Sequence, residues 1–130
     1  MLVIDPYNSL EHTAEKGDSE TAYIAKFLNK LRFFARKYQV HLIVIAHPKK
    51  VMKDKNGVYE VPDPYDVSGS ANWYNVSDNF FTVYKNTSST ELHVKKVKHS
   101  HYGQLGICRF EFNRDTEIFT EFKEFKKEWE

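Results

Sequence analysis

Two short apolar runs that each end on a polar side chain constrain the fold of this chain more than any other feature. LVID ends on Asp5 and HLIVIAH ends on His47, and a proline directly follows each of these residues. Continuous apolar runs of this length are typical of strands that a parallel sheet buries on both faces. If the two strands are neighbours, Asp5 and His47 lie at the same end of the sheet.

The segment between the two runs, residues 19 to 39, predicts an amphipathic helix. Ser19 can cap its start, and Glu20 suits the positive end of the helix dipole. Strand, helix and strand then form a βαβ unit, for which a right-handed crossover is the default. The apolar side chains that recur at helical spacing are Ile24, Phe27, Leu28, Leu31, Phe34 and Ala35.

The rest of the chain predicts a long loop at residues 48 to 66, a short helix from about Ser70, and a run of strands. Alternating segments separated by turn residues are typical of antiparallel strands. These segments are NFFTVYKN, TELHVKKVKH, GICRFEFN and EIFTEF. We therefore expect an α/β fold in which a parallel βαβ unit precedes mostly antiparallel strands, with a domain at residues 1–122 and a charged tail at residues 123–130.

The composition excludes several classes of protein. The net charge of the 130 residues is only +1, so a site for nucleic acid must be a local basic cluster. No apolar stretch approaches the roughly 18 residues that span a membrane, so we expect no membrane partner. Cys108 is the single cysteine, which excludes an internal disulfide framework and fits a cytoplasmic location.

Asp5 and His47 are the candidate site residues that follow from the strand pattern alone. In open α/β sheets, ligands bind beyond the carboxyl ends of the parallel strands. An aspartate there can hold Mg²⁺ directly or through water, and a histidine can hydrogen-bond a phosphate oxygen. The alternative is that Asp5 only begins a turn and that His47 is a hydrogen-bonded residue at the sheet edge.

Four segments, in matching order, resemble the motor domain of ring-forming replicative helicases of the DnaB and Twinkle type, especially phage and bacterial primase–helicases. LVIDPYNSLEH is similar to their Walker B strand, and HLIVIAHPKK to their sensor strand. YDVSGSANWYNVSDNFFTVYKN is similar to the next motif, and VKKVKHSHYGQLGICRFEFN to the C-terminal hairpin. The resemblance covers residues 1 to 119 and implies a RecA-like P-loop NTPase fold.

The resemblance also implies roles for single residues. Asp5 would be the Walker B acid that holds Mg²⁺ through water, Asn8 would contact the nucleotide, and His47 would sense the γ-phosphate. Lys98 would act in trans in place of an arginine finger, because Ser100 stands where many relatives have arginine. ATP and Mg²⁺ are the implied cofactors. Single-stranded DNA and identical subunits in a ring, a hexamer, are the implied partners.

The basic loop after His47 would be the DNA-binding segment in such a motor. Lysines contact phosphates without reading sequence, as a motor that tracks any single strand requires. The alternative is a solvated loop whose lysines only aid solubility. The DNA-binding residues that the resemblance implies are Lys49, Lys50, Lys53, Lys55, Ser68, Gly69, Ser70 and Asn75.

The main departure from the family is the phosphate-binding loop. No GxxxxGKS or GxxxxGKT occurs in the 130 residues, so we expect a partial RecA-like fold without the P-loop strand. Without that loop's backbone amides and lysine, no group cradles the β- and γ-phosphates. We therefore expect that this chain is part of an ATP-dependent DNA helicase. By itself, the chain should neither hydrolyse ATP nor bind it tightly. The alternatives are a non-catalytic nucleic-acid-binding module and a truncated remnant of such a helicase.

Overall fold

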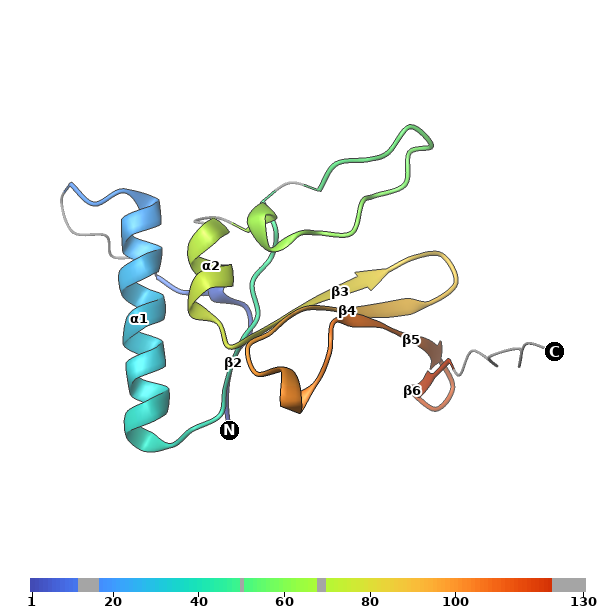
Figure 1. The fold of residues 1–130 in the computed structure, drawn as a ribbon. Coiled ribbons are helices and arrows are strands. Elements are labelled where there is room, and N and C mark those ends of the chain that lie inside the picture. The colour runs from blue at the N-terminus through green and yellow to red at the C-terminus, as the bar shows by residue number, and fades with distance from the viewer. Residues whose placement is uncertain (12–16, 50, 68–69, 123–130) are drawn as a thin grey trace. The chain divides into compact units, whose positions relative to one another are not determined.

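The computed structural model describes residues 1–11, 17–49, 51–67 and 70–122. The chain forms two compact units, Met1–Ser77 and Asp78–Glu130, and each has a sheet of its own (Figure 1). The first unit contains a parallel pair of strands, and the second contains four antiparallel strands. The chain is therefore a mixed α/β protein. The predicted boundary after residue 122 adjoins residues outside the described ranges and stays a prediction.

The two apolar runs form the predicted parallel pair in the first unit. β1 (Leu2–Ile4) lies beside β2 (Leu42–Val44), with Leu2 opposite Leu42 and Ile4 opposite Val44. The pairing continues beyond the strands, because the backbone N–H of Ile45 donates to the Ile4 carbonyl at 2.8 Å. Among the described residues, β2 has no strand on its other edge.

The long helix lies where the periodicity predicts it. α1 (Glu20–Tyr38) begins at Ser19, whose hydroxyl accepts from the backbone N–H of Ala22 at 3.2 Å. It ends at Gln39, whose left-handed φ of +52° turns the chain toward β2. Ile24 is the most deeply buried side chain of the helix, with 1% of its surface exposed. The predicted capping residue is confirmed, and the predicted core face is buried at Ile24 and Leu28, whereas the prediction is wrong for Phe34, which is exposed.

A buried tyrosine joins the turn after β1 to both helices. Tyr7 begins the short 3₁₀ helix η1 (Tyr7–Ser9), and its N–H donates to the Ile45 carbonyl at 2.7 Å. Its ring lies 5.2 Å from that of Phe27 on α1 and meets Trp73 edge-on at 4.9 Å. Burial raises the pKa of the Tyr7 phenol, and the nearby Tyr23 and Glu20 add to this shift.

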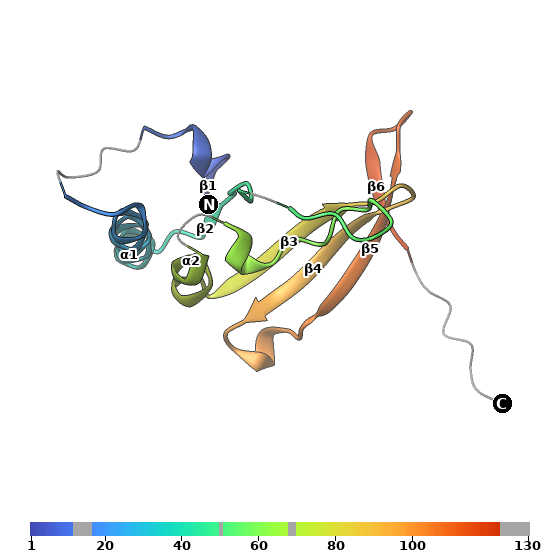
Figure 2. The ribbon, with the colours of Figure 1, turned by 90° about the horizontal axis from the view of Figure 1, so that it is seen from above.

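The second helix lies beside the first. α2 (Ser70–Val76) starts at the predicted residue, and Figures 1 and 2 both show it next to α1. The side-chain amide of Asn72 donates to the Thr21 carbonyl of α1 at 3.2 Å, and Trp73 fills the space beside Tyr7. The core of the first unit therefore includes one face of α1, Tyr7, Val67 and Trp73.

The segment predicted as a long loop contains an ordered hairpin. Lys53 and Tyr59 form an antiparallel bridge, and the Asp54 carboxylate accepts from the N–H groups of Asn56 and Val58 at 2.8 and 2.9 Å. Gly57, with φ of +79°, provides the left-handed conformation that closes the turn. The loop ends in a second 3₁₀ helix, η2 (Pro64–Asp66), which the Asp63 side chain caps.

The second unit is the predicted antiparallel sheet. Its strands are adjacent in chain order, and η3 (Ser100–Tyr102) joins the second to the third. Within the described ranges, neither helix of the chain combines the length and the hydropathy that crossing a bilayer requires. The strands are β3 (Asn79–Lys85), β4 (Thr90–Val97), β5 (Gly106–Asn113) and β6 (Ile118–Glu121).

Candidate nucleotide and DNA site

Three of the predicted site residues lie together at the carboxyl end of the parallel pair. Asp5 directly follows β1, and His47 follows β2, so parallel pairing brings both to one end of the sheet. The backbone N–H of His47 donates to the Asn8 side-chain carbonyl at 2.8 Å. All three residues are exposed. The structure thus brings Asp5, Asn8 and His47 to one end of the parallel pair.

The core of the first unit packs against the segment that links Asp5 to Asn8. Tyr7 is buried against Phe27 and Trp73, and its backbone N–H is bonded to β2 at Ile45. Because Asn8 follows Tyr7 in the same 3₁₀ helix, the position of its side chain depends on this packing. The bond from His47 to Asn8 therefore links the end of β2 to the aromatic core.

The described residues fit only part of a magnesium nucleotide site. The exposed Asp5 carboxylate supplies the hard oxygen that Mg²⁺ prefers. Asn8 accepts one hydrogen bond from His47 through Oδ1, which leaves the second lone pair of that oxygen and the side-chain N–H donors for a ligand. Among the residues that the structure describes, no group of three or more His, Cys, Asp and Glu could hold a metal ion. Asp5 could therefore contribute one contact, but these residues alone form no complete site.

The basic loop is anchored at its base and exposed at its tip. The Lys49 ammonium pairs with the Glu20 carboxylate at 2.8 Å, and both side chains are exposed. Such surface pairs contribute about 1 kcal/mol or less, so Lys49 can exchange Glu20 for a phosphate at little cost. Lys53 lies 4.7 Å from the centre of the Tyr59 ring, and Lys55 is exposed in the hairpin turn. Lys50 lies outside the described residues.

The other predicted DNA contacts belong to the start of α2. Ser68 and Gly69 lie outside the described residues, and Ser70 is described only as the first residue of the helix. Asn75 is exposed on α2. The helix adjoins the end of the basic loop, since the Tyr74 ring lies 6.0 Å from that of Tyr65 in η2.

Lys98, the predicted trans-acting cation, is engaged within its own sheet. Its ammonium pairs with the Asp78 carboxylate at 2.7 Å, and its backbone N–H donates to the Asp78 carbonyl at 2.9 Å. Both side chains are exposed, so the ion pair adds little stability and can exchange. The Asp78 carboxylate therefore occupies one of the three donors of the exposed Lys98 ammonium.

Sequence reasoning missed a polar network on β4 and β5. His93 has 8% of its surface exposed, and its Nε2 lies 2.8 Å from the Glu91 carboxylate. The other oxygen of Glu91 accepts from Arg109 at 3.2 Å and from Asn86 at 3.3 Å. The hydrogen bond from His93, assisted by Arg109, lowers the pKa of Glu91. The signal was the Glu-x-His spacing, which places both side chains on one face of a strand.

The network predicts a pH dependence for the second unit. Because the pKa of Glu91 is lower in the folded chain than its ordinary 4.5, the ionised carboxylate stabilises the fold at pH values above 4.5. This contribution is lost as the pH falls through the folded pKa. We expect Glu91→Gln to lower the free energy of unfolding at pH 7 by about 1–2 kcal/mol and to flatten its acid dependence.

Urea denaturation between pH 3 and 7, followed through NMR signals of β4 and β5, measures this effect. Glu111→Gln is the matched control, because Glu111 is exposed on β5 of the same sheet. An acid dependence that is the same in Glu91→Gln and in the unchanged chain would contradict the prediction.

The fold and the strand-end residues define a mixed α/β protein whose parallel pair presents Asp5 and His47 at one end. No protein-family model matches the chain. It is similar to the Twinkle homolog protein, chloroplastic/mitochondrial, of Arabidopsis thaliana, with 32% identity over 127 residues that cover 92% of this chain. The chain spans 18% of the length of that relative.

The similarity supports the relation to Twinkle-type proteins that the four motifs predicted. Because it covers 92% of this chain, it includes most of the segments from which the resemblance was drawn. The name of the relative refers to chloroplasts and mitochondria, whereas our expectation for this chain was the cytoplasm. That location stays a prediction.

Proposed function

We propose that this chain is part of the motor of an ATP-dependent replicative DNA helicase of the DnaB and Twinkle type, with a RecA-like fold. The observation that carries the proposal is the parallel pairing of β1 with β2, which puts Asp5 and His47 at one end of neighbouring strands. The similarity to the Arabidopsis Twinkle homolog protein supports it independently. In the complete protein, identical subunits would form a ring, which we expect to be a hexamer.

In this function, the strand-end residues would contact nucleotide and the basic loop would contact single-stranded DNA. Asp5 would hold the water shell of Mg²⁺, and His47 would bond to the γ-phosphate. His47 is separated from Lys49 by Pro48 alone, so a small displacement of the imidazole changes the start of the loop. The Lys49 N–H donates to the Asp66 carbonyl at 2.9 Å, which couples that start to η2 at the other end.

The same proposal includes the inactivity of the chain by itself. The 130 residues contain no P-loop motif, and the described residues contain no group of three or more His, Cys, Asp and Glu that could hold a metal ion. The two sheets are separate among the described residues. In the RecA-like fold that we propose, the missing P-loop strand would belong between β2 and β3. The proposed motor therefore needs a phosphate-binding segment that is not present in these residues.

The reading frame upstream of Met1 provides the first test. An in-frame P-loop supports the helicase motor. A stop codon followed by a ribosome-binding site favours the second candidate function, a non-catalytic nucleic-acid-binding module or a remnant of such a helicase. The absence of the P-loop motif from the 130 residues is the observation that favours this second candidate.

Substitution of the strand-end residues provides the decisive test in a polypeptide that includes such a P-loop. We expect Asp5→Asn to lower the kcat of ATP hydrolysis about 100-fold, since it removes an electrostatic contact from the reacting centre. We expect His47→Ala to keep basal hydrolysis and to lose its stimulation by single-stranded DNA. Steady-state ATPase assays with and without an oligothymidine measure both effects.

Glu11→Gln is the control for these variants, because Glu11 is an exposed acid six positions after Asp5. It should leave both the basal and the DNA-stimulated rates unchanged. An Asp5→Asn protein with the full rate would exclude the assigned role of Asp5, and with it the motor interpretation of this end of the sheet.

A further inference from the structure

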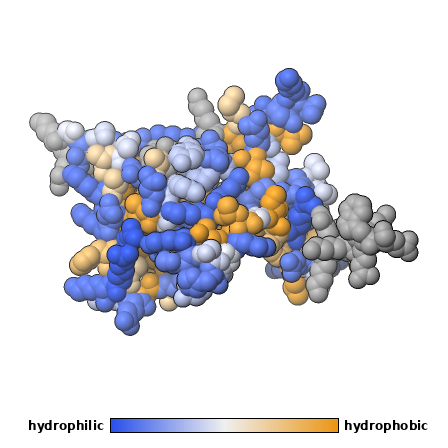
Figure 3. Space-filling model, viewed as in Figure 1, coloured by the Kyte–Doolittle hydropathy of each residue, from blue (hydrophilic) through white to orange (hydrophobic). Residues whose placement is uncertain are grey.

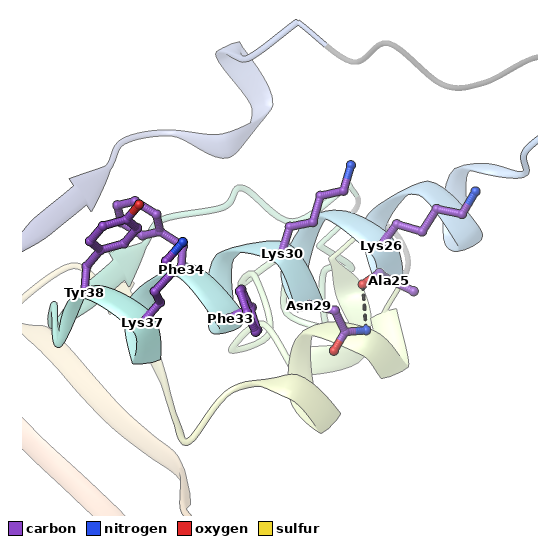
Figure 4. Close-up of a pocket in the computed structure, with 8 residues that line it drawn as sticks. All are labelled: Ala25, Lys26, Asn29, Lys30, Phe33, Phe34, Lys37 and Tyr38. Atoms are coloured by element: carbon purple, nitrogen blue, oxygen red, sulfur yellow. Dashed lines mark hydrogen bonds between the residues drawn. The ribbon is translucent and has the colours of Figure 1, made fainter.

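The outer side of α1 carries a shallow groove that we call the aromatic–lysine groove (Figure 4). Residues spaced by four, three and four positions, such as Lys26, Lys30, Phe33 and Lys37, share one face of a helix. This face lies opposite the side that buries Ile24. The groove is lined by Ala25, Lys26, Asn29, Lys30, Phe33, Phe34, Lys37 and Tyr38.

The aromatic–lysine groove leaves large apolar side chains in water. Phe33 has 70% of its surface exposed, and Tyr38 has 58%. The space-filling view in Figure 3 shows hydrophobic side chains in separate patches among hydrophilic ones. Of the described residues that line the groove, none is acidic, and Lys26 is paired with Asp18 beside it at 2.8 Å. Aromatic side chains within a cationic rim are typical of a surface that binds a partner.

The arrangement of the rings favours a protein segment over a stacked nucleic-acid base. The Phe34 and Tyr38 rings lie 4.8 Å apart at 46° and so cover part of each other. The Lys37 ammonium lies 5.4 Å from the centre of the Tyr38 ring and so occupies a place where a base could stack on that ring. In Figure 4 the Lys26 and Lys30 side chains extend from the helix in the same direction. Carboxylates with an apolar anchor therefore match this surface best.

The chain itself contains a segment of that chemistry, EVPDPYD at residues 60–66, which we call the acidic segment. It carries three carboxylates, from Glu60, Asp63 and Asp66, and no lysine or arginine. Tyr65 has 59% of its surface exposed and can serve as the apolar anchor. Two prolines and the capped turn of η2 hold the segment in one conformation, which lowers the entropy cost of binding.

The two surfaces lie apart within the first unit. Asn72 of α2 bonds to α1, and Tyr74 of α2 lies beside Tyr65 of η2, so α2 stands between the groove and the acidic segment. Figures 1 and 2 show this order of α1, α2 and η2 from two directions. A groove on one side of a unit and its complement on the other side favour head-to-tail contact between copies.

We propose that the aromatic–lysine groove of one chain binds the acidic segment of a second copy of this chain. The inference deepens, and rests on, the part of the proposed function in which identical subunits assemble. Exposed lysine–carboxylate pairs contribute about 1 kcal/mol or less each, so burial of Phe33 against Tyr65 supplies much of the affinity. The isolated chain therefore associates weakly and reversibly, and less so at high salt.

Sedimentation equilibrium of the 130-residue chain tests the contact with two variants. The groove variant, Lys30→Glu with Phe33→Ala, and the segment variant, Glu60→Lys with Tyr65→Ala, should each lower the association constant at least tenfold. Their equimolar mixture should recover a one-to-one dimer, because it still pairs one intact groove with one intact acidic segment. Asp63 and Asp66 stay unchanged since they form the capping box of η2. Lys30→Arg with Phe33→Leu, which keeps charge and apolarity, should associate as the unchanged chain does.

Three outcomes would overturn the proposal. The unchanged chain could be monomeric throughout. The two variants could associate as the unchanged chain does, which would point to pairing through the edge of β2 that has no partner strand among the described residues. The mixture could fail to form a dimer although circular dichroism shows both variants folded; loss of oligothymidine binding by the groove variant would then identify nucleic acid as the occupant. None of these readouts measures ATP hydrolysis, so failure here is distinguishable from failure of the proposed function.

Discussion

An Ile24→Ala variant is expected to lose about 3 kcal/mol of the free energy of unfolding of the first unit. Ile24 is buried to 99% on the face of α1 that packs into the core, as its 1% exposure shows. Truncation removes apolar contacts and leaves a cavity in the core of the first unit. Because marginal domains have only about 5–15 kcal/mol of stability, this loss is a large share of the total.

Urea denaturation followed by tryptophan fluorescence measures this loss. The chain has two tryptophans, so a Trp129→Phe background leaves Trp73, which belongs to the same core, as the reporter. Phe33→Ala is the matched control on the same helix, because Phe33 is 70% exposed and its truncation should change stability by about 0.5 kcal/mol or less. Equal losses in the two variants would contradict the assignment of the two faces of α1.

Replacement of three loop lysines is expected to weaken binding to single-stranded DNA about tenfold or more at low salt. Lys49, Lys53 and Lys55 are the basic residues of the loop within the described ranges, and each is exposed. If each contacts one phosphate, their loss should also reduce the slope of log K against log salt by about 2, at about 0.7 per contact. Fluorescence anisotropy of a labelled oligothymidine at several salt concentrations gives both quantities.

The control for the loop variant removes the same charge from another surface. The variant with Lys26, Lys30 and Lys37 all changed to Ala lowers the net charge equally but leaves the loop intact. It should bind the oligothymidine nearly as the unchanged chain does. If both triple variants weaken binding equally, the attraction is a property of overall charge, and the loop is not the DNA site.

Local periodicity predicted most of the secondary structure because it depends on neighbours in the sequence. The 3.6-residue period gave α1, the alternation gave β3 to β6, and Ser19 gave the helix start. The parallel pairing of β1 and β2 followed from the βαβ rule. Phe34 shows the limit of the method: the period placed it in the core, whereas it is 37% exposed at the edge of the groove.

The sequence was enough to predict where the site residues lie in the fold, but not which hydrogen bonds and ion pairs they form. Asp5 and His47 could be placed because each ends an apolar run. The bond from His47 to Asn8, the pairing of Lys98 with Asp78, and the Glu91 network depend on turn geometry and rotamers of residues far apart in the sequence. Periodicity contains no information about such distances. The exposure of Phe33 escaped prediction for the same reason, since hydropathy alone assigned no partner to it.

The hydrogen bond from the Lys49 N–H to the Asp66 carbonyl joins the two ends of the basic loop, so that the loop begins and ends at neighbouring positions. A loop whose ends are joined in this way can gain or lose residues at its turn with little loss of stability, because the entropy cost of closing a loop grows only slowly with its length. The length of this loop could thus differ from one homologue to another while the Asp5 carboxylate and the His47 imidazole keep their positions.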